Sequence, residues 1–232
     1  MKQNNIVAAS VLALGMIALG FVLRSAVLDF QRGNRIVTVK GLSEREVKAD
    51  KITWPLTYKE LGNDPAVMYD VLERKNQLVV AFLKQGGLKD EEISINPPTI
   101  SDRQADNYSN GTVAYRFRAT SIITVTSKDV DRVRQLMRRQ GELMKQGVAI
   151  LGEDWSTGSV NYEFTGLNEI KPEMMEEATK NALLTARKFT DSKGSLVIHK
   201  ASQGQFSIED RDANTPYIKR VRVVNTVDYV IK

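Results

Sequence analysis

The sequence predicts an α+β protein, with two loosely repeated halves in which helices pack on mostly antiparallel sheet, preceded by an N-terminal membrane helix. Three observations support this class: an uncharged apolar N-terminus, several segments of alternating polar and β-branched residues, and one strongly periodic helix late in the chain. The expected order is β-β-α-β-β followed by α-β-α-β-β. We place the membrane helix in residues 1–27, a linker in 28–34 and the α+β domain in 35–232.

The N-terminal segment has the composition of a membrane span. Residues 6–23 carry no charge, and about 20 apolar residues suffice to cross a bilayer. We interpret the segment as an uncleaved signal-anchor. A cleaved signal peptide is the alternative, because Lys2 supplies a basic start, but no small-x-small cleavage site follows the apolar run. The charges on the two sides do not decide its orientation. The expected anchor residues are Ile6, Leu12, Leu14, Ile17, Leu19, Phe21 and Leu23.

Two strands are expected directly after the linker. Arg35–Gly41 and Glu44–Tyr58 both alternate apolar or β-branched residues with polar ones, which is typical of half-buried strands. The simplest interpretation is a turn at Gly41–Ser43. Pro55 cannot donate a ladder hydrogen bond, so it indicates an edge position or a bulge.

A first amphipathic helix and a hairpin follow. The helix is expected to open at Asn63-Asp64-Pro65 and to end at Gly86-Gly87. A strand over Ile93–Ser101, interrupted by Pro97-Pro98, should pair with a long strand over Thr112–Thr126.

A second helix is expected over Lys128–Gln146, with Ser127 as its cap and Gly141 weakening its middle. Val148–Gly152 and Ser159–Phe164 predict one strand region interrupted by a loop.

The most regular helix signal is Lys171–Gly194. Pro172 falls in its first turn, and alanine recurs every four residues, which predicts a small-residue stripe that lets another backbone approach closely. Two final strands are expected over Ser195–Ser207 and Tyr217–Ile231, joined by a charged turn at Glu209–Thr215. The alanines of the stripe are Ala178, Ala182 and Ala186.

Composition excludes several kinds of site. The absence of cysteine rules out disulfides, thiolate metal sites and iron–sulfur clusters. His199 is the only histidine, so a serine–histidine–aspartate arrangement would depend on it alone. No phosphate-binding glycine loop or nucleophile elbow is present. We therefore expect no enzyme activity, no catalytic residue, no metal and no cofactor. The nearly balanced charge argues against nucleic acid as a partner.

A basic helix face offers a surface for a partner. Its arginines point to contact with an acidic surface on another subunit, and the alternative is a solvated face with ion pairs inside the chain. The residues of this arginine face are Arg132, Arg134, Arg138 and Arg139.

Several short patterns together resemble the SIMPL-domain family of bacterial envelope proteins. They are Val37-x-Val39-x-Gly41, Ala49-Asp50, Gly86-Gly87-Leu88 followed by Glu92-Ile93-x-Ile95, Tyr115-x-Phe117-x-Ala119, and Ala186-Arg187-Lys188 at the end of the alanine helix. The resemblance spans roughly Arg35–Lys232, whereas Phe189–Gly194 departs from the family's usual helix ending. It implies an α+β domain outside the cytoplasm, often self-assembling, linked in some members to envelope or oxidative stress, without established catalytic residues.

The expected function is that of a non-enzymatic, membrane-anchored envelope protein that acts through self-assembly as a homo-oligomer or through protein binding. Its main domain should lie in the periplasm, tethered to the inner membrane, or be secreted there if the N-terminus is cleaved. The alternative is a small-ligand or lipid-binding module, whose mark would be a sizeable apolar cavity between helix and sheet. A hydrolase using isolated carboxylates or His199 is the less favoured choice.

Overall fold

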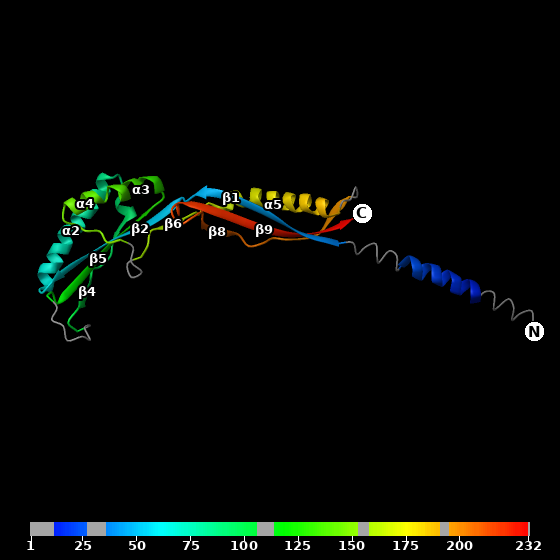
Figure 1. Cartoon of the computed structure of the whole chain (residues 1–232), viewed down its shortest axis with the longest axis horizontal. Coiled ribbons are helices and arrows are strands. Elements are labelled where there is room, and N and C mark those ends of the chain that lie inside the picture. Colours follow the sequence, from blue (N-terminus) through cyan, green and yellow to red (C-terminus); the bar gives the residue numbers. More distant parts are fainter. Residues whose placement is uncertain (1–11, 27–35, 106–113, 153–157, 191–194, 232) are drawn as a thin grey trace, which may run out of the picture. The chain divides into compact units, whose positions relative to one another are not determined.

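The computed structural model describes residues 12–26, 36–105, 114–152, 158–190 and 195–231 (Figure 1). Contacts divide the chain into two compact units. Unit 1 comprises Met1–Arg45, Ile170–Ser207 and Val221–Lys232, and unit 2 comprises Glu46–Glu169 and Ile208–Arg220. Helices and antiparallel sheets confirm the α+β class. Each unit combines distant parts of the sequence, so neither unit coincides with one of the two predicted halves.

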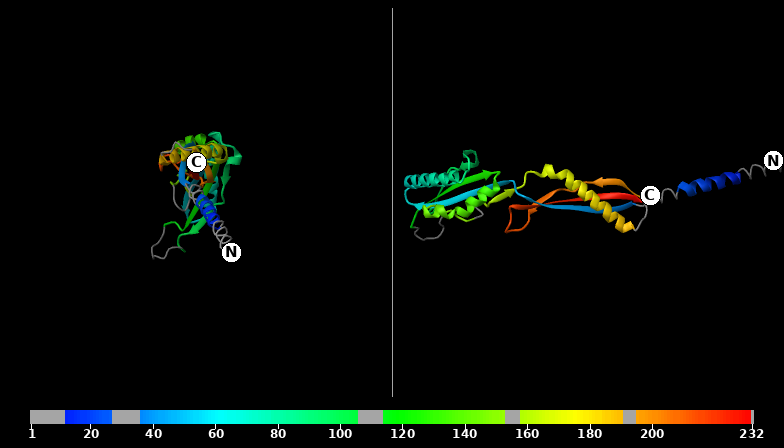
Figure 2. Two further views of the ribbon diagram at one scale, coloured as in Figure 1. Left: turned by 90° about the vertical axis from the view of Figure 1, so that its right-hand side faces the viewer. Right: turned by 90° about the horizontal axis from the view of Figure 1, so that it is seen from above.

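Unit 1 is built on a sheet with the strand order β1-β9-β7, and β8 also pairs with β9. Helix α5 runs along this sheet (Figures 1 and 2). Its core is formed by Val39, Val227 and Tyr229 packed against the alanines of the helix. The strands of this sheet are β1 (Ile36–Lys48), β7 (Leu196–Ser202), β8 (Ser207–Asp210) and β9 (Ile218–Ile231), and the helix on it is α5 (Leu167–Thr190). Most of β8 falls in unit 2.

The predicted turn at Gly41–Ser43 is wrong, because β1 continues through all three residues to Lys48. Gly41 is buried beneath α5, and a Cβ atom there would lie 1.9 Å from the carbonyl oxygen of Ala178 and 2.8 Å from the Cβ of Ala182. The predicted burial of the alanine stripe is confirmed. This glycine therefore allows a helix to approach a strand closely, and β1 ends only at Lys48.

Unit 2 has a second antiparallel sheet with the order β3-β5-β2-β6, in which β4 also pairs with β5. The long β2–β5 pair runs from Ile52 opposite Ser127 to Gly62 opposite Phe117. Helices α2, α3 and α4 lie over one face of this sheet (Figures 1 and 2). The strands are β2 (Lys51–Gly62), β3 (Ile93–Ile95), β4 (Thr99–Asp102), β5 (Phe117–Ser127) and β6 (Asn161–Glu163). The helices are α2 (Pro65–Gln85), the short 3₁₀ helix η1 (Asp90–Glu92), α3 (Val130–Arg139) and α4 (Gly141–Lys145).

The predicted strand over Ile93–Ser101 is split by its two prolines. Ile95 pairs with Ile123 and Thr99 pairs with Thr120, so one extra residue is accommodated around Pro97-Pro98. A local shift of this kind is a bulge, the place where an edge strand tolerates proline. The predicted hairpin with the following strand is confirmed, since both β3 and β4 pair with β5.

The helix boundaries confirm some signals and correct others. Asp64 caps α2 as expected, with its Oδ1 accepting a hydrogen bond of 2.8 Å from the backbone N–H of Ala66. The cap of α3 is Asp129, not Ser127, and the predicted long second helix divides before Gly141. Helix α5 begins at Leu167, before Pro172. The predicted strand at Val148–Gly152 is absent from that described segment, where the backbone N–H of Val148 donates to the carbonyl of Leu143 and that of Leu151 to the carbonyl of Thr57.

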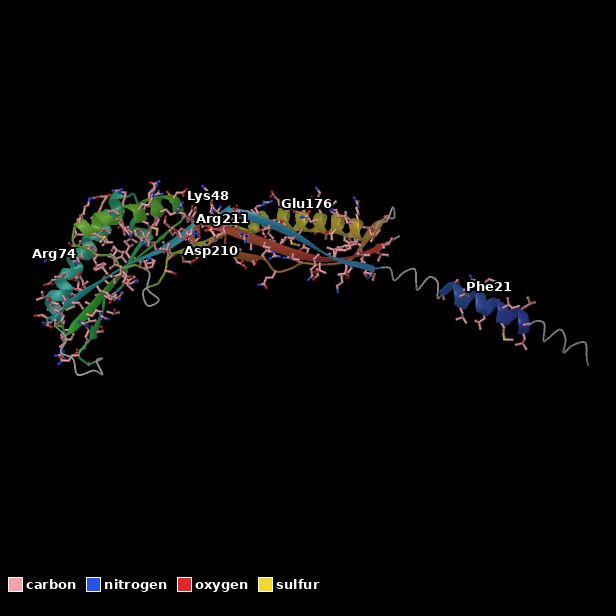
Figure 3. The ribbon with its side chains drawn as sticks, viewed as in Figure 1. Phe21, Lys48, Arg74, Glu176, Asp210 and Arg211 are labelled. Carbon is pink, nitrogen blue, oxygen red and sulfur yellow. The ribbon has the colours of Figure 1, made fainter. Side chains whose placement is uncertain are left out.

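The N-terminal helix spans residues 12–26, and Phe21 projects from it (Figure 3). None of the helices in the described part of the chain is long and apolar enough to cross a membrane. The expected anchor residue Ile6 lies outside the described residues.

Candidate functional site

An open groove lies between α2 and the β3–β4 edge of the sheet in unit 2. Its volume is about 960 Å³ and most of its lining is apolar. One wall is formed by Tyr69, Leu72, Glu73, Asn76, Gln77, Val80, Ala81 and Lys84 of α2, and the floor by Ile95, Asn96, Pro97, Pro98 and Ile100. We call this hollow the α2 groove.

Helix α2 carries two stripes of side chains. Met68, Leu72, Val79 and Leu83 form the stripe that is buried on the sheet. The second stripe starts at Tyr69 and recurs every three or four residues to Lys84, which places its members on one adjoining face of the helix. The sequence pattern did not single out this second stripe, because amides and charges interrupt its apolar residues.

The floor of the groove lacks a covering element in the described structure. Ile95 and Ile100 belong to the face of the sheet on which α2 packs, since they lie opposite the buried Ile123 and Ala119. They are nevertheless 53% and 47% exposed. Two-layer folds normally cover such a face with a helix. This part of the sheet is therefore open to a ligand.

Asn76 supplies a polar group with a fixed orientation inside the apolar groove. Its Oδ1 accepts hydrogen bonds from the Tyr58 hydroxyl and, at 2.9 Å, from the Ser121 hydroxyl. Both donors are buried, and they lie opposite each other on β2 and β5. Burial raises the pKa of Tyr58, which keeps its hydroxyl protonated and able to donate. Asn76 also lines the groove, and in the described structure its NH₂ group has no hydrogen-bond partner and remains available to a ligand.

The two ends of the groove carry opposite charges. Glu73 lies one helical turn from Tyr69 at one end, and no ion pair found among the described residues involves it. Lys84 lies at the other end and forms an ion pair with Asp90 across 2.5 Å. Both partners are largely exposed, so this pair is weakly held.

The predicted arginine face forms mainly contacts within unit 2. Arg132 donates to the carbonyl of Gly87 at 2.7 Å, Arg134 lies 3.4 Å above the ring centroid of Tyr217, and Arg139 pairs with both carboxylate oxygens of Glu142. Arg138 is exposed, and no ion pair between described residues includes it. These contacts agree with the alternative of a solvated face, while the subunit contact stays a prediction.

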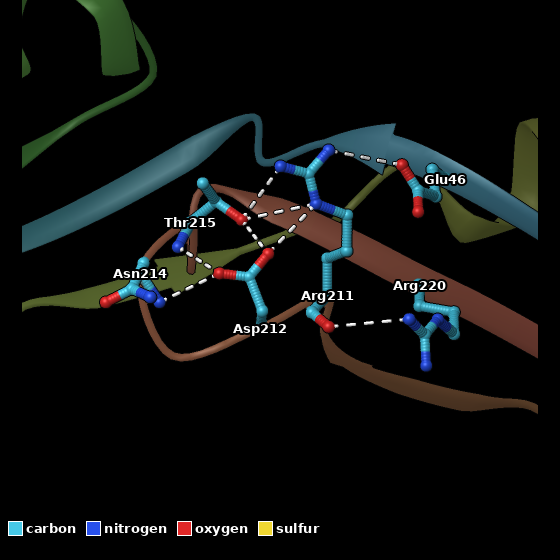
Figure 4. A network of polar contacts seen from close by, with 6 residues as sticks. All are labelled: Glu46, Arg211, Asp212, Asn214, Thr215 and Arg220. Carbon is cyan, nitrogen blue, oxygen red and sulfur yellow. Dashed lines mark hydrogen bonds and ion pairs between the residues drawn. The ribbon is translucent and has the colours of Figure 1, made fainter.

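His199 and the charged turn show no arrangement for catalysis. His199 is exposed at an irregularity of β7, where the register with β9 shifts. In the turn, Asp212 accepts hydrogen bonds from the Thr215 hydroxyl and from Arg211, and these contacts lower the pKa of Asp212 to about 2 (Figure 4). Arg211 also reaches Glu46 at 3.4 Å. The polar groups of this turn thus bond to one another. Within the described ranges, no cluster of histidine, aspartate and glutamate could hold a metal ion.

The comparison with protein families decides the affiliation of the chain. Residues 37–225 match the model described as SIMPL, protein of unknown function (DUF541). The chain belongs to the SIMPL family. This confirms the resemblance found in the sequence. No curated protein matches the chain significantly.

The residues that carry the SIMPL resemblance have structural roles. Gly41 lets α5 pack closely on β1. Asp50 accepts hydrogen bonds from the backbone N–H groups of Thr165 and Gly166 at 2.8 and 3.0 Å. A Cβ atom on Gly86 would lie 2.2 Å from Leu136, and Gly87 has a φ of +89° that favours glycine. These residues of the family pattern therefore serve the fold and do not mark a functional site. The α2 groove is the candidate site.

Proposed function

We propose that this SIMPL protein is a non-catalytic binding protein whose unit 2 holds an apolar ligand in the α2 groove. The observation that supports this most directly is a largely apolar groove of about 960 Å³ between a helix and the edge of a sheet. Ligand sites commonly measure about 300–1,000 Å³ and combine apolar walls with a few placed polar groups. The groove has that size and composition, with Asn76 as the placed polar group.

The lining chemistry favours binding over catalysis. The described residues that line the groove include no serine, threonine, cysteine or histidine. Covalent catalysis requires a nucleophile within hydrogen-bond reach of a base. Glu73 and Lys84 stand at opposite ends, about 16 Å apart along α2 at about 1.5 Å per residue, too far to act as a pair.

A charge placed on the groove floor tests this function. Ile95→Arg is expected to weaken the binding of an environment-sensitive apolar dye at least tenfold, because a guanidinium would occupy the apolar floor beside Val80. Dye fluorescence is titrated with the full chain in mild detergent below its micelle concentration. Val67→Arg is the matched control, since Val67 is exposed on α2 but does not line the groove. Equal dye binding by both variants, with unchanged melting temperatures, would contradict the proposal.

Self-assembly is a second candidate, supported by the free edge of the sheet in unit 1. In the described residues β7 pairs with β9 on one side and with no strand on its other side. Val197 and Ile198 on this strand are exposed, and so is Phe189 near the end of α5. A bare strand edge with apolar side chains is a template for pairing with another chain. We therefore propose a homo-oligomer joined through β7, with binding to another protein as the alternative.

Light scattering at several concentrations tests this assembly. Val197→Lys is expected to lower the measured mass toward that of one chain, because paired edges would bring two ammonium groups together. Leu184→Lys serves as the control, since Leu184 is also exposed in unit 1 but lies on α5. A mass that neither substitution changes would argue against assembly through β7.

Membrane attachment through residues 6–23, with the main domain in the periplasm, is part of the same proposal. It is supported by the uncharged sequence of this stretch. An alkaline wash of membranes would leave an anchored chain in the pellet, and complete release of the chain would refute the anchor.

A further inference from the structure

We propose that the ligand of the α2 groove is a short apolar peptide in an extended conformation, with its free amino terminus at Glu73 and its free carboxyl terminus at Lys84. This inference rests on the proposed function, because it names the ligand class of the same groove. It is carried by the dimensions of the groove, by the fixed amide of Asn76, and by the opposite charges at the two ends.

The length of the groove suits an extended chain. The wall from Tyr69 to Lys84 is about 22 Å long at about 1.5 Å per helical residue. An apolar floor that includes Ile95 and Ile100 runs beside this wall. An extended peptide laid along it can place alternate side chains on the two isoleucines.

The distance between the charged ends sets the length of the peptide. Glu73 and Lys84 are about 16 Å apart along α2, and an extended chain advances about 3.3 Å per residue. A peptide of about five residues spans this distance. Its alternate side chains point to one side, so apolar residues at odd positions would lie on Ile95 and Ile100.

The polar groups distinguish a peptide from a lipid chain. Asn76 presents its NH₂ group at a point between the two charged ends, where a peptide offers a backbone carbonyl. A fatty acid carries its oxygens at one end only, and would leave this donor without a partner in an apolar surrounding. Buried donors without a partner are unfavourable. The position of Asn76 therefore favours a chain with carbonyl groups along its length.

The charges are complementary to the two ends of a peptide. The carboxylate of Glu73, with the ring of Tyr69 one turn away, suits an ammonium group. Lys84 can release Asp90 and bind a terminal carboxylate instead, because the Lys84–Asp90 ion pair is exposed to solvent and contributes little free energy. An acid at one end and a base at the other also fix the direction of the bound peptide.

Competition with the apolar dye tests the inference on the full chain. The probes are the pentapeptide Val-Ser-Val-Ser-Val with free ends, the same peptide acetylated or amidated, and palmitate. We expect the free peptide to displace the dye, and each blocked end to weaken binding by up to about fivefold. Glu73→Gln should remove the effect of acetylation and Lys84→Gln that of amidation. Glu91→Gln, which changes an exposed carboxylate outside the groove, should preserve both effects.

Each other outcome overturns a defined part of the argument. Equal binding of the free and blocked peptides would refute recognition of the ends. Displacement by palmitate alone would identify a lipid site and refute the peptide. Dye binding that depends on Ile95 but resists every peptide would refute the peptide and preserve the proposed function. Dye binding that Ile95→Arg does not affect would refute the proposed function itself.

Discussion

Replacing Gly41 with alanine is expected to destabilise unit 1 by about 3 kcal/mol, the upper part of the range for overpacked cores. The added Cβ atom would lie 1.9 Å from the carbonyl oxygen of Ala178 and 2.5 Å from the backbone nitrogen of Ala182. Both obstacles are backbone atoms of α5, so no side-chain rotation relieves the clash. The helix must move away from β1, which loosens the packing of the alanine stripe on the sheet.

Two spectroscopic signals can locate this effect. Urea unfolding followed by circular dichroism reports both units, whereas the fluorescence of Trp54, which is buried in unit 2, reports that unit. Gly41→Ala should shift the circular dichroism transition to lower urea more than the tryptophan fluorescence transition. Gly141→Ala is the control, because nothing lies within 4 Å of its added Cβ atom, and alanine is the better helix former. Equal stability of the two variants would contradict the close packing of α5 on β1.

Local signals predicted the elements of this fold better than its long-range packing. The cap at Asp64 and the interruption at Pro97-Pro98 follow from neighbouring residues, and the structure confirms both. Gly41 was misinterpreted because a glycine between two alternating segments is normally a turn signal. Its real role depends on Ala178, which is distant in sequence and becomes a neighbour only when α5 lies on the sheet.

The sequence indicated what kind of binding site to expect, but not which residues would form it. Sequence reasoning connected a ligand-binding alternative with an apolar cavity between helix and sheet, and such a groove is present. The residues that form it could not be chosen beforehand. Asn76 resembles a solvent-exposed polar residue of an amphipathic helix, and only the positions of Tyr58 and Ser121 on two other elements show that its amide is fixed.

Replacing Asn76 with alanine is expected to destabilise unit 2 by about 2–3 kcal/mol, because two buried hydroxyl donors lose their acceptor and each such loss costs about 1–3 kcal/mol. Ser121 is completely buried, whereas the hydroxyl of Tyr58 keeps a second, longer contact with the carbonyl of Leu72 at 3.4 Å. The expected loss of stability is therefore smaller than the sum of two complete hydrogen-bond losses. Urea unfolding followed by tryptophan fluorescence measures the loss.

A second substitution separates this hydrogen-bond network from simple loss of packing. Tyr58→Phe in the Asn76→Ala background should cost less than Tyr58→Phe in the unchanged protein, because its hydroxyl has already lost the better acceptor. Gln77→Ala, in the neighbouring position on the groove wall, should have little effect on stability, since Gln77 is exposed. If Asn76→Ala and Gln77→Ala were equally mild, Asn76 would not be held by the sheet. Its NH₂ group would then have no fixed direction, and the preference for a carbonyl-bearing ligand would lose its structural basis.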